Sequence, residues 1–151
     1  AGDPAGLELC GLGARDSLRL EAGFPLNGAD LDQRHTPLEA GAAWAVKMDK
    51  GDFIGRRALE TQRAEGLTVK LTGFTTTGKC PPPRAHYPIL AQGGQIAEAT
   101  SAMLSPSLGT GIGMAYLPVT LSKPGNQLEI DIRGRHYPIV TSRRPFYKPA
   151  S

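Results

Sequence analysis

Arg15 and Arg84 have the side-chain chemistry to hold an acidic ligand. Arginine presents a planar fork of donors that matches a carboxylate bidentately, and it is usually buried only when it is paired. Arg15 lies in a stretch of good helix formers. Arg84 follows three prolines, which form a stiff, extended segment that fixes where its side chain points. An ordinary structural ion pair is the alternative interpretation of both residues, and composition alone favours it.

The histidines and cysteines do not form a recognisable site in the sequence. His35, His86 and His136 are separated by about fifty residues each, and none has a carboxylate or a cysteine at a ligand spacing, so we expect no metal site. Cys10 and Cys80 lie outside any C-x-x-C spacing, which predicts reduced, buried thiols instead of a disulfide. The P-loop, the zinc-protease helix and the nucleophile elbow are also missing from the sequence.

The composition indicates a turn-rich chain that can still build a core. Of the 151 residues, 19 are Gly and 13 are Pro, which implies many turns, while 40% are apolar. The net charge of +3 comes from scattered basic residues and not from a dense stripe, so we expect no nucleic-acid partner. No apolar run approaches the length of a membrane span and no signal peptide is visible, so we expect no membrane partner.

The elements that must position these side chains begin with a short strand and a helix. Residues 7–10 are predicted to form the strand, and residues 12–22 the helix, which Gly23 ends. Asp16 and Arg19 lie three positions apart within that helix, a spacing that allows them to pair.

A second strand and a second helix follow in the sequence. Trp44 and Val46 alternate with small or polar neighbours, which predicts a strand, and residues 53–65 predict a helix ended by Gly66. Two helices and two short strands are too few to close a sheet of their own. We therefore expect residues 1–65 to be an incomplete α+β unit.

From residue 66 onward the pattern changes to alternating apolar residues with turn signals every eight to twelve residues. Such regular short strands predict a small antiparallel barrel or a sandwich. We expect residues 66–151 to form this all-β domain, with strands in residues 67–74, 86–92, 94–104, 109–117, 126–132 and 136–142.

Four ordered blocks resemble the C-terminal part of the glycine cleavage T-protein, the tetrahydrofolate-dependent aminomethyltransferase family. They are GLGARDSLRLEAGFPLNGADLD, TPLEAGAAWAVKMDKGDFIGRRAL, PRAHYPIL and ATSAMLSPSLGTGIGMAYLP. The resemblance implies a three-domain, cloverleaf-like enzyme that binds folate in a central cavity. This chain would supply the end of the second domain and the final β-barrel.

The resemblance also implies a reaction. The family takes the aminomethyl group carried on the lipoyl arm of the H-protein, releases ammonia, and passes the one-carbon unit to tetrahydrofolate. Its essential aspartate and its folate-contacting glutamate lie upstream of the first block, so no catalytic residue is expected in this chain. We therefore expect the fragment alone to be inactive.

Four residues take roles from the family motifs. Arg15 corresponds to the folate-contacting arginine, and Trp44 to an aromatic position near the same cavity, where its alternative is plain core packing. Arg84 corresponds to an arginine that supports an interdomain contact. Tyr147 is the nearest candidate for a C-terminal tyrosine that contacts folate in some relatives.

Two other functions stay open from the sequence. Folate-linked sarcosine or dimethylglycine dehydrogenases carry a similar module behind a flavin domain, and T-protein-like folate-binding proteins without enzymatic activity carry a cysteine motif that this chain lacks. For the enzyme, we expect the lipoyl-bearing H-protein as partner. The expected compartment is the cytoplasm, or the mitochondrial matrix in a eukaryote.

Overall fold

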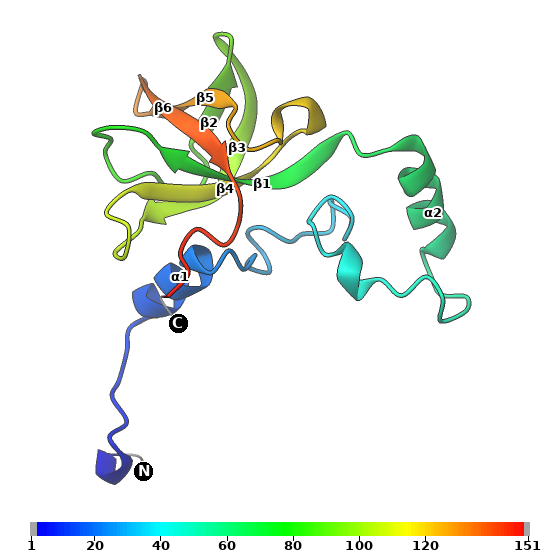
Figure 1. The fold of residues 1–151 in the computed structure, drawn as a ribbon, viewed down its shortest axis with the longest axis horizontal. Helices are drawn as coiled ribbons and strands as arrows, with labels where there is room; N and C mark the ends of the chain where they lie inside the picture. The colour runs from blue at the N-terminus through cyan, green and yellow to red at the C-terminus, as the bar shows by residue number, and fades with distance from the viewer. Residues whose placement is uncertain (1–2, 150–151) are drawn as a thin grey trace.

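The chain folds into two helices followed by a closed six-stranded antiparallel barrel (Figure 1). A computed structural model describes residues 3–149. This architecture confirms the predicted fold class in its order, a short N-terminal piece followed by a small β-barrel, and it decides between the barrel and the sandwich. The N-terminal piece, expected to be α+β, contains helices and no strand in the described residues.

Every segment predicted as a strand after residue 66 overlaps with an observed strand, with bounds that differ by two residues or fewer. The strand order around the barrel is β1-β4-β3-β2-β5-β6, with β6 pairing back to β1, and all neighbours are antiparallel. The strands are β1 (Val69–Thr76), β2 (Pro88–Ala91), β3 (Gly94–Leu104), β4 (Gly111–Pro118), β5 (Gln127–Ile132) and β6 (Arg135–Ser142).

The barrel interior is filled by branched and aromatic side chains, which the alternation along each strand turns inward. Phe74, Ile89 and Ile130 are completely buried in it. Gly113 of β4 makes room for this packing, because a Cβ atom there would lie 2.7 Å from the carbonyl oxygen of Ser101 and would overlap the ring of Phe74. The barrel is thus a packed core and not a channel.

The helix α1 (Leu12–Glu21) lies against β3 and β4. Its Leu20 is buried among apolar side chains of β1 and β4. Gly23, at a φ of +74°, ends the helix: its amide donates to Leu20 and the amide of Phe24 donates to Arg19, the pairing of a Schellman motif. Gly23 also admits Arg144, whose Cβ would lie 2.7 Å from a Cβ at this position.

The second helix, α2 (Arg56–Glu65), stands away from the barrel (Figure 1). It is preceded by the short 3-10 turn η2 (Ala43–Ala45), and two similar turns are η1 (Asp3–Ala5) and η3 (Val119–Leu121). The predicted helix over residues 53–65 is confirmed, although Gly55 delays its start to Arg56.

Both strands predicted before residue 66 are wrong. Residues 7–10 form no strand and run outward from α1, where no neighbouring strand is available to pair with them (Figure 1). Trp44 lies in η2, because two alternating apolar residues without a partner strand do not hold an extended backbone. The small residues around Trp44 allow the tighter turn instead.

The predicted free thiols are present, but the expected burial is wrong for Cys10. Cys10 is exposed on the segment that precedes α1, whereas Cys80 is half-buried against the barrel core, where burial raises the pKa of its thiol. Within residues 3–149, neither helix has the length and apolar character needed to cross a membrane.

Candidate functional site

A buried carboxylate, Asp30, organises the contact between α1 and the barrel. Its side chain is fully buried, and one oxygen lies 2.7 Å from Nη1 of Arg19. The same oxygen accepts a hydrogen bond from the amide of Leu26 at 2.9 Å. A buried acid requires such partners, because an unpaired charge away from water is very costly.

Two hydroxyls of β3 complete the environment of Asp30. Ser101 donates to one carboxylate oxygen at 2.8 Å and accepts a hydrogen bond from Nη2 of Arg19 at 2.9 Å, while Thr100 donates to the other oxygen. Tyr116 of β4 donates its hydroxyl to the backbone carbonyl of Asp30 at 2.8 Å. We call these residues the Asp30 network; it fixes the guanidinium of Arg19 from α1 against β3.

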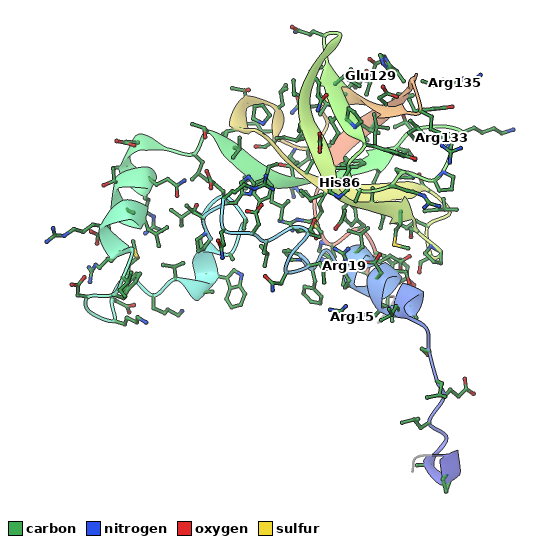
Figure 2. The ribbon with its side chains drawn as sticks, turned by 180° about the vertical axis from the view of Figure 1, so that it is seen from behind. Arg15, Arg19, His86, Glu129, Arg133 and Arg135 are labelled. Atoms are coloured by element: carbon green, nitrogen blue, oxygen red, sulfur yellow. The ribbon has the colours of Figure 1, made fainter. Side chains whose placement is uncertain are left out.

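Arg15 lies one helical turn before Arg19 but in a different environment. Its side chain is exposed and forms no ion pair or hydrogen bond with residues 3–149. Figure 2 shows both arginines on α1. They line a groove of about 420 Å³ together with Leu12, Leu26, Thr100 and Ser101, which we call the Arg15 groove. A guanidinium without a protein partner is available to bind a ligand there.

The predicted pairing of Asp16 with Arg19 is confirmed. Arg19 Nη2 lies 2.6 Å from Asp16 Oδ1. Arg19 thus holds two carboxylates, one half-exposed and one buried, which leaves it no free edge to offer a ligand. This makes Arg19 a positioning residue of the groove and leaves Arg15 as the arginine that can bind.

Glu21, the last residue of α1, ties the helix to the turn between β3 and β4. Its carboxylate accepts hydrogen bonds from the hydroxyl of Ser105, and from the amide of Ser107 at 3.0 Å and its hydroxyl at 2.8 Å. Burial alone would raise the pKa of Glu21, but these hydrogen bonds lower it below its ordinary value. The carboxylate is therefore charged in the folded protein at neutral pH.

Tyr116 also contacts the loop segment that follows Asp30 in the chain, through the ring of His35. The ring of His35 stacks on it with 3.5 Å between centroids, and His35 Nδ1 lies 2.8 Å from Asp32 Oδ1. Burial, followed by the neighbouring carboxylates, raises the pKa of Tyr116 to about 12. Tyr116 therefore stays neutral and keeps donating its hydrogen bond to Asp30.

Trp44 lies in a different groove from Arg15. This groove, of about 700 Å³, is also lined by Phe24, Lys70 and Arg144. Trp44 is 80% exposed, so core packing is excluded for it within the described residues. Trp44 and Arg15 do not line a common cavity.

The C-terminal segment closes over α1 and brings Tyr147 near it. The amides of Phe146 and Tyr147 both donate to the carbonyl of Glu21, at 2.9 and 3.0 Å. Arg144 donates to the carbonyls of Gly23 and Leu71, each at 3.3 Å, and burial lowers the pKa of its guanidinium. Tyr147 itself is partly exposed and lines neither groove.

Arg84 lines neither the Arg15 groove nor the groove beside Trp44. It is exposed and lines a third pocket with Arg133 and Arg135. Its chain neighbour Ala85 lines the Arg15 groove, so the extended segment after the prolines separates the two sites.

The residues that build the site around Arg15 were not predicted from the sequence. Asp30 stands in an apparent surface loop, and Ser101 belongs to a strand seventy-one positions further along the chain. Polar residues at two successive positions of a strand, Thr100 and Ser101, were the available signal, because one of the two must face inward. No rule of sequence spacing indicates that Thr100 and Ser101 contact Asp30 and not another acid of the chain.

Two family models match the chain. The model described as the glycine cleavage T-protein C-terminal barrel domain matches residues 70–148, and the model described as the GCVT N-terminal domain matches residues 1–50. The first match covers the barrel from the second residue of β1 onward, and the second covers α1, the Asp30 loop and η2.

Curated relatives and a solved structure agree with these models. An aminomethyltransferase of Nostoc sp. is 49% identical over 97% of this chain, and one of Halothermothrix orenii is 47% identical over 97%. The crystal structure of glycine cleavage system aminomethyltransferase T from Bartonella henselae superposes with a TM-score of 0.89 at 31% identity, covering 97% of this chain and 41% of that one. The chain spans about two fifths of the length of the relatives, 39% and 41% for the two named.

Proposed function

Because the chain belongs to the glycine cleavage T-protein family, we propose that it is the C-terminal part of a tetrahydrofolate-dependent aminomethyltransferase. The parent enzyme moves a one-carbon unit from the aminomethyl-lipoyl arm of the H-protein to tetrahydrofolate and releases ammonia. The observation that carries this proposal is the match of the barrel model to residues 70–148, together with relatives named aminomethyltransferase.

The Arg15 groove is the proposed folate contact of this chain. Folate carries carboxylates and a flat pterin with hydrogen-bonding edges. The guanidinium of Arg15 offers several hydrogen-bond donors, and none of them has a partner among residues 3–149. The Asp30 network holds the neighbouring Arg19, so the wall behind Arg15 is rigid. A fixed wall lowers the entropic cost of binding.

Trp44 and Tyr147 are proposed as secondary contacts with the same ligand. Trp44 exposes a flat ring that can pack against a flat ligand, and Tyr147 is held beside the end of α1 by its backbone. Because neither lines the Arg15 groove, a single folate would reach them only if further walls completed one cavity around it. For Arg84 we propose an interdomain support.

The surface before β1 supports the proposal that this chain works with further domains. The six most exposed large apolar side chains lie there and are 66% to 104% exposed, whereas no large apolar side chain after the start of β1 is more than 44% exposed within the described residues. Large apolar groups left in water mark interfaces. We propose residues 1–65 as the end of a folate-binding domain and residues 66–151 as the barrel domain; the exposed group comprises Leu9, Leu12, Leu18, Phe24, Trp44 and Ile54.

The chemistry at the reacting amine is proposed to lie outside this chain. The resemblance puts the essential aspartate in the family's first domain. Among residues 3–149, the carboxylates at the Arg15 groove are Asp16, which lines it, and Asp30 behind it, and both are already engaged by Arg19. Carboxylate oxygens that already hold a guanidinium and neighbouring donors are not free to contact a reacting amine. The role of this chain is therefore to bind and orient tetrahydrofolate.

The dehydrogenase alternative would place the same module behind a flavin domain. The curated relatives named above are aminomethyltransferases, which favours the transferase. The proposed partner is the H-protein. The proposed compartment is the cytoplasm of a bacterium, or the mitochondrial matrix in a eukaryote.

A titration with 5-formyltetrahydrofolate tests the role of Arg15. We expect weak binding to the 151-residue chain, and about tenfold weaker binding to Arg15→Ala, since a charge-assisted contact is lost. Arg57→Ala is the matched control, because Arg57 is an exposed arginine of α2 with no hydrogen bond from the described residues. Equal affinities of Arg15→Ala and the unchanged chain would remove Arg15 from the site.

A further inference from the structure

One end of the barrel forms a pocket with an apolar floor and a basic rim. The pocket has a volume of about 340 Å³, which lies within the range of small-molecule sites. Ile132, Tyr87 and Tyr137 contribute to its floor, and Arg84, Arg133 and Arg135 to its rim. We call it the barrel mouth.

The register of β5 and β6 explains why these residues meet. Ile132 pairs with Arg135 and Ile130 pairs with Tyr137, and directly paired residues of antiparallel strands point to the same face. Ile130 is fully buried in the barrel core. The side chains of Arg135 and Tyr137 therefore extend the inward face of the barrel at its open end.

The acidic residues of the same hairpin occupy the opposite face. Asp131 pairs with His136, and Glu129 Oε2 lies 3.7 Å from His136 Nδ1. Asp131 also accepts the amide of Gly134 at 2.6 Å. Strand alternation thus separates the carboxylates of this hairpin from its arginines.

The rim arginines consequently carry uncompensated charge. None of Arg84, Arg133 and Arg135 forms an ion pair with any residue of 3–149. Figure 2 shows Arg133 and Arg135 at the same end of the barrel, far from Arg15. Arg133 is held at the hairpin tip with a φ of +58°. Like charges gathered around a pocket repel one another unless an anion joins them.

We propose that the barrel mouth binds a small organic anion with at least two carboxylate or phosphate groups on a flat body. The arginine forks match either kind of oxyanion, and the two tyrosine rings and Ile132 present an apolar surface for the body. Barrel mouths are common ligand sites because the strands end there around a fixed floor. This site is distinct from the Arg15 groove, so it does not depend on the proposed folate contact.

Titration of the 151-residue chain with three probes tests the site. Trimesate carries three carboxylates on a flat ring, tricarballylate carries three on a flexible chain, and pyrophosphate carries phosphates without a body. We expect trimesate to bind with shifts of the backbone amide NMR signals of Arg133, Gly134 and Tyr137, and about tenfold more tightly than tricarballylate. Pyrophosphate is expected to bind more weakly than trimesate and to shift the same signals.

Arg133→Gln and Arg135→Gln should each weaken trimesate binding about fivefold, because each removes one fork from the exposed rim. Arg57→Gln on α2 should leave the affinity unchanged. These two rim positions carry the test, since Arg84 also has the interdomain role proposed above. Absence of binding, equal affinities in all variants, or shifts confined to the Arg15 groove would overturn the site. Equal affinities for trimesate and tricarballylate would contradict the proposal that the ligand has a flat body.

Discussion

Arg15 and Arg19 are four residues apart on one helix, yet their surroundings give them different roles. Arg19 is 14% exposed and holds Asp16 on one side and Asp30 on the other. Arg15 is exposed and has no partner among residues 3–149. The difference depends on Asp30, which takes the buried position beside Arg19 and draws only that guanidinium inward.

Removing the charge of Asp30 should therefore destabilise the fold. We expect Asp30→Asn to lower the free energy of unfolding by about 3 kcal/mol, because it breaks a buried ion pair and disturbs the hydroxyls of Thr100 and Ser101. Urea denaturation measures this change. Asp16→Asn is the matched control: its carboxylate pairs with the same arginine but is half-exposed, so its loss should cost under about 1 kcal/mol.

At the residue scale, the sequence could predict only the local part of this arrangement. The pair of Asp16 with Arg19 follows from helical spacing. The contacts of Asp30 with Ser101 and of Tyr116 with Asp30 join residues more than seventy positions apart, so they depend on how the barrel closes. Nothing in the sequence states which acid in the loop turns inward.

Among the elements, the end of α1 and the turn between β3 and β4 are joined through Glu21. Its pKa is lowered from 4.5 in the folded protein, so its charged form stabilises the fold above the unfolded value, and this contribution is lost as the pH falls through the lowered pKa. We expect the free energy of unfolding to decline on acidification from about pH 5 to about pH 3. Glu21→Gln should show a shallower decline in that range.

Denaturation by urea at a series of pH values measures this difference. Glu65→Gln is a suitable control, since Glu65 is an exposed residue at the end of α2 and its substitution should keep the pH slope of the unchanged protein. Identical slopes for Glu21→Gln and the unchanged protein would show that Glu21 does not join helix and turn in this way.

The elements themselves were predictable where a pattern extended over many residues. The six barrel strands follow from alternation between turns, and α1 from its helix formers and Gly23. The short segments failed: residues 7–10 and the strand around Trp44 rested on two or three apolar positions each. Two or three apolar positions do not specify a partner strand, so tertiary contacts determine the backbone conformation of such a segment.

At the scale of the whole molecule, the barrel is complete and the segment before it is open. The exposed Trp44 and Ile54 lie on that open part, and the Arg15 groove borders it. The chain covers only 39% of a relative such as the Nostoc aminomethyltransferase. The proposed function therefore requires that the length present in such relatives supplies the walls which complete a folate cavity around the Arg15 groove.

The rate of methylene-tetrahydrofolate formation from an aminomethyl-lipoyl H-protein tests this requirement most sharply, measured for this chain and for the full-length parent enzyme proposed above. We expect turnover by the full-length protein and none by the 151-residue chain. Arg15→Ala in the full-length protein should raise the KM for tetrahydrofolate about tenfold. Turnover by the chain alone, or an unchanged KM in Arg15→Ala, would contradict the account.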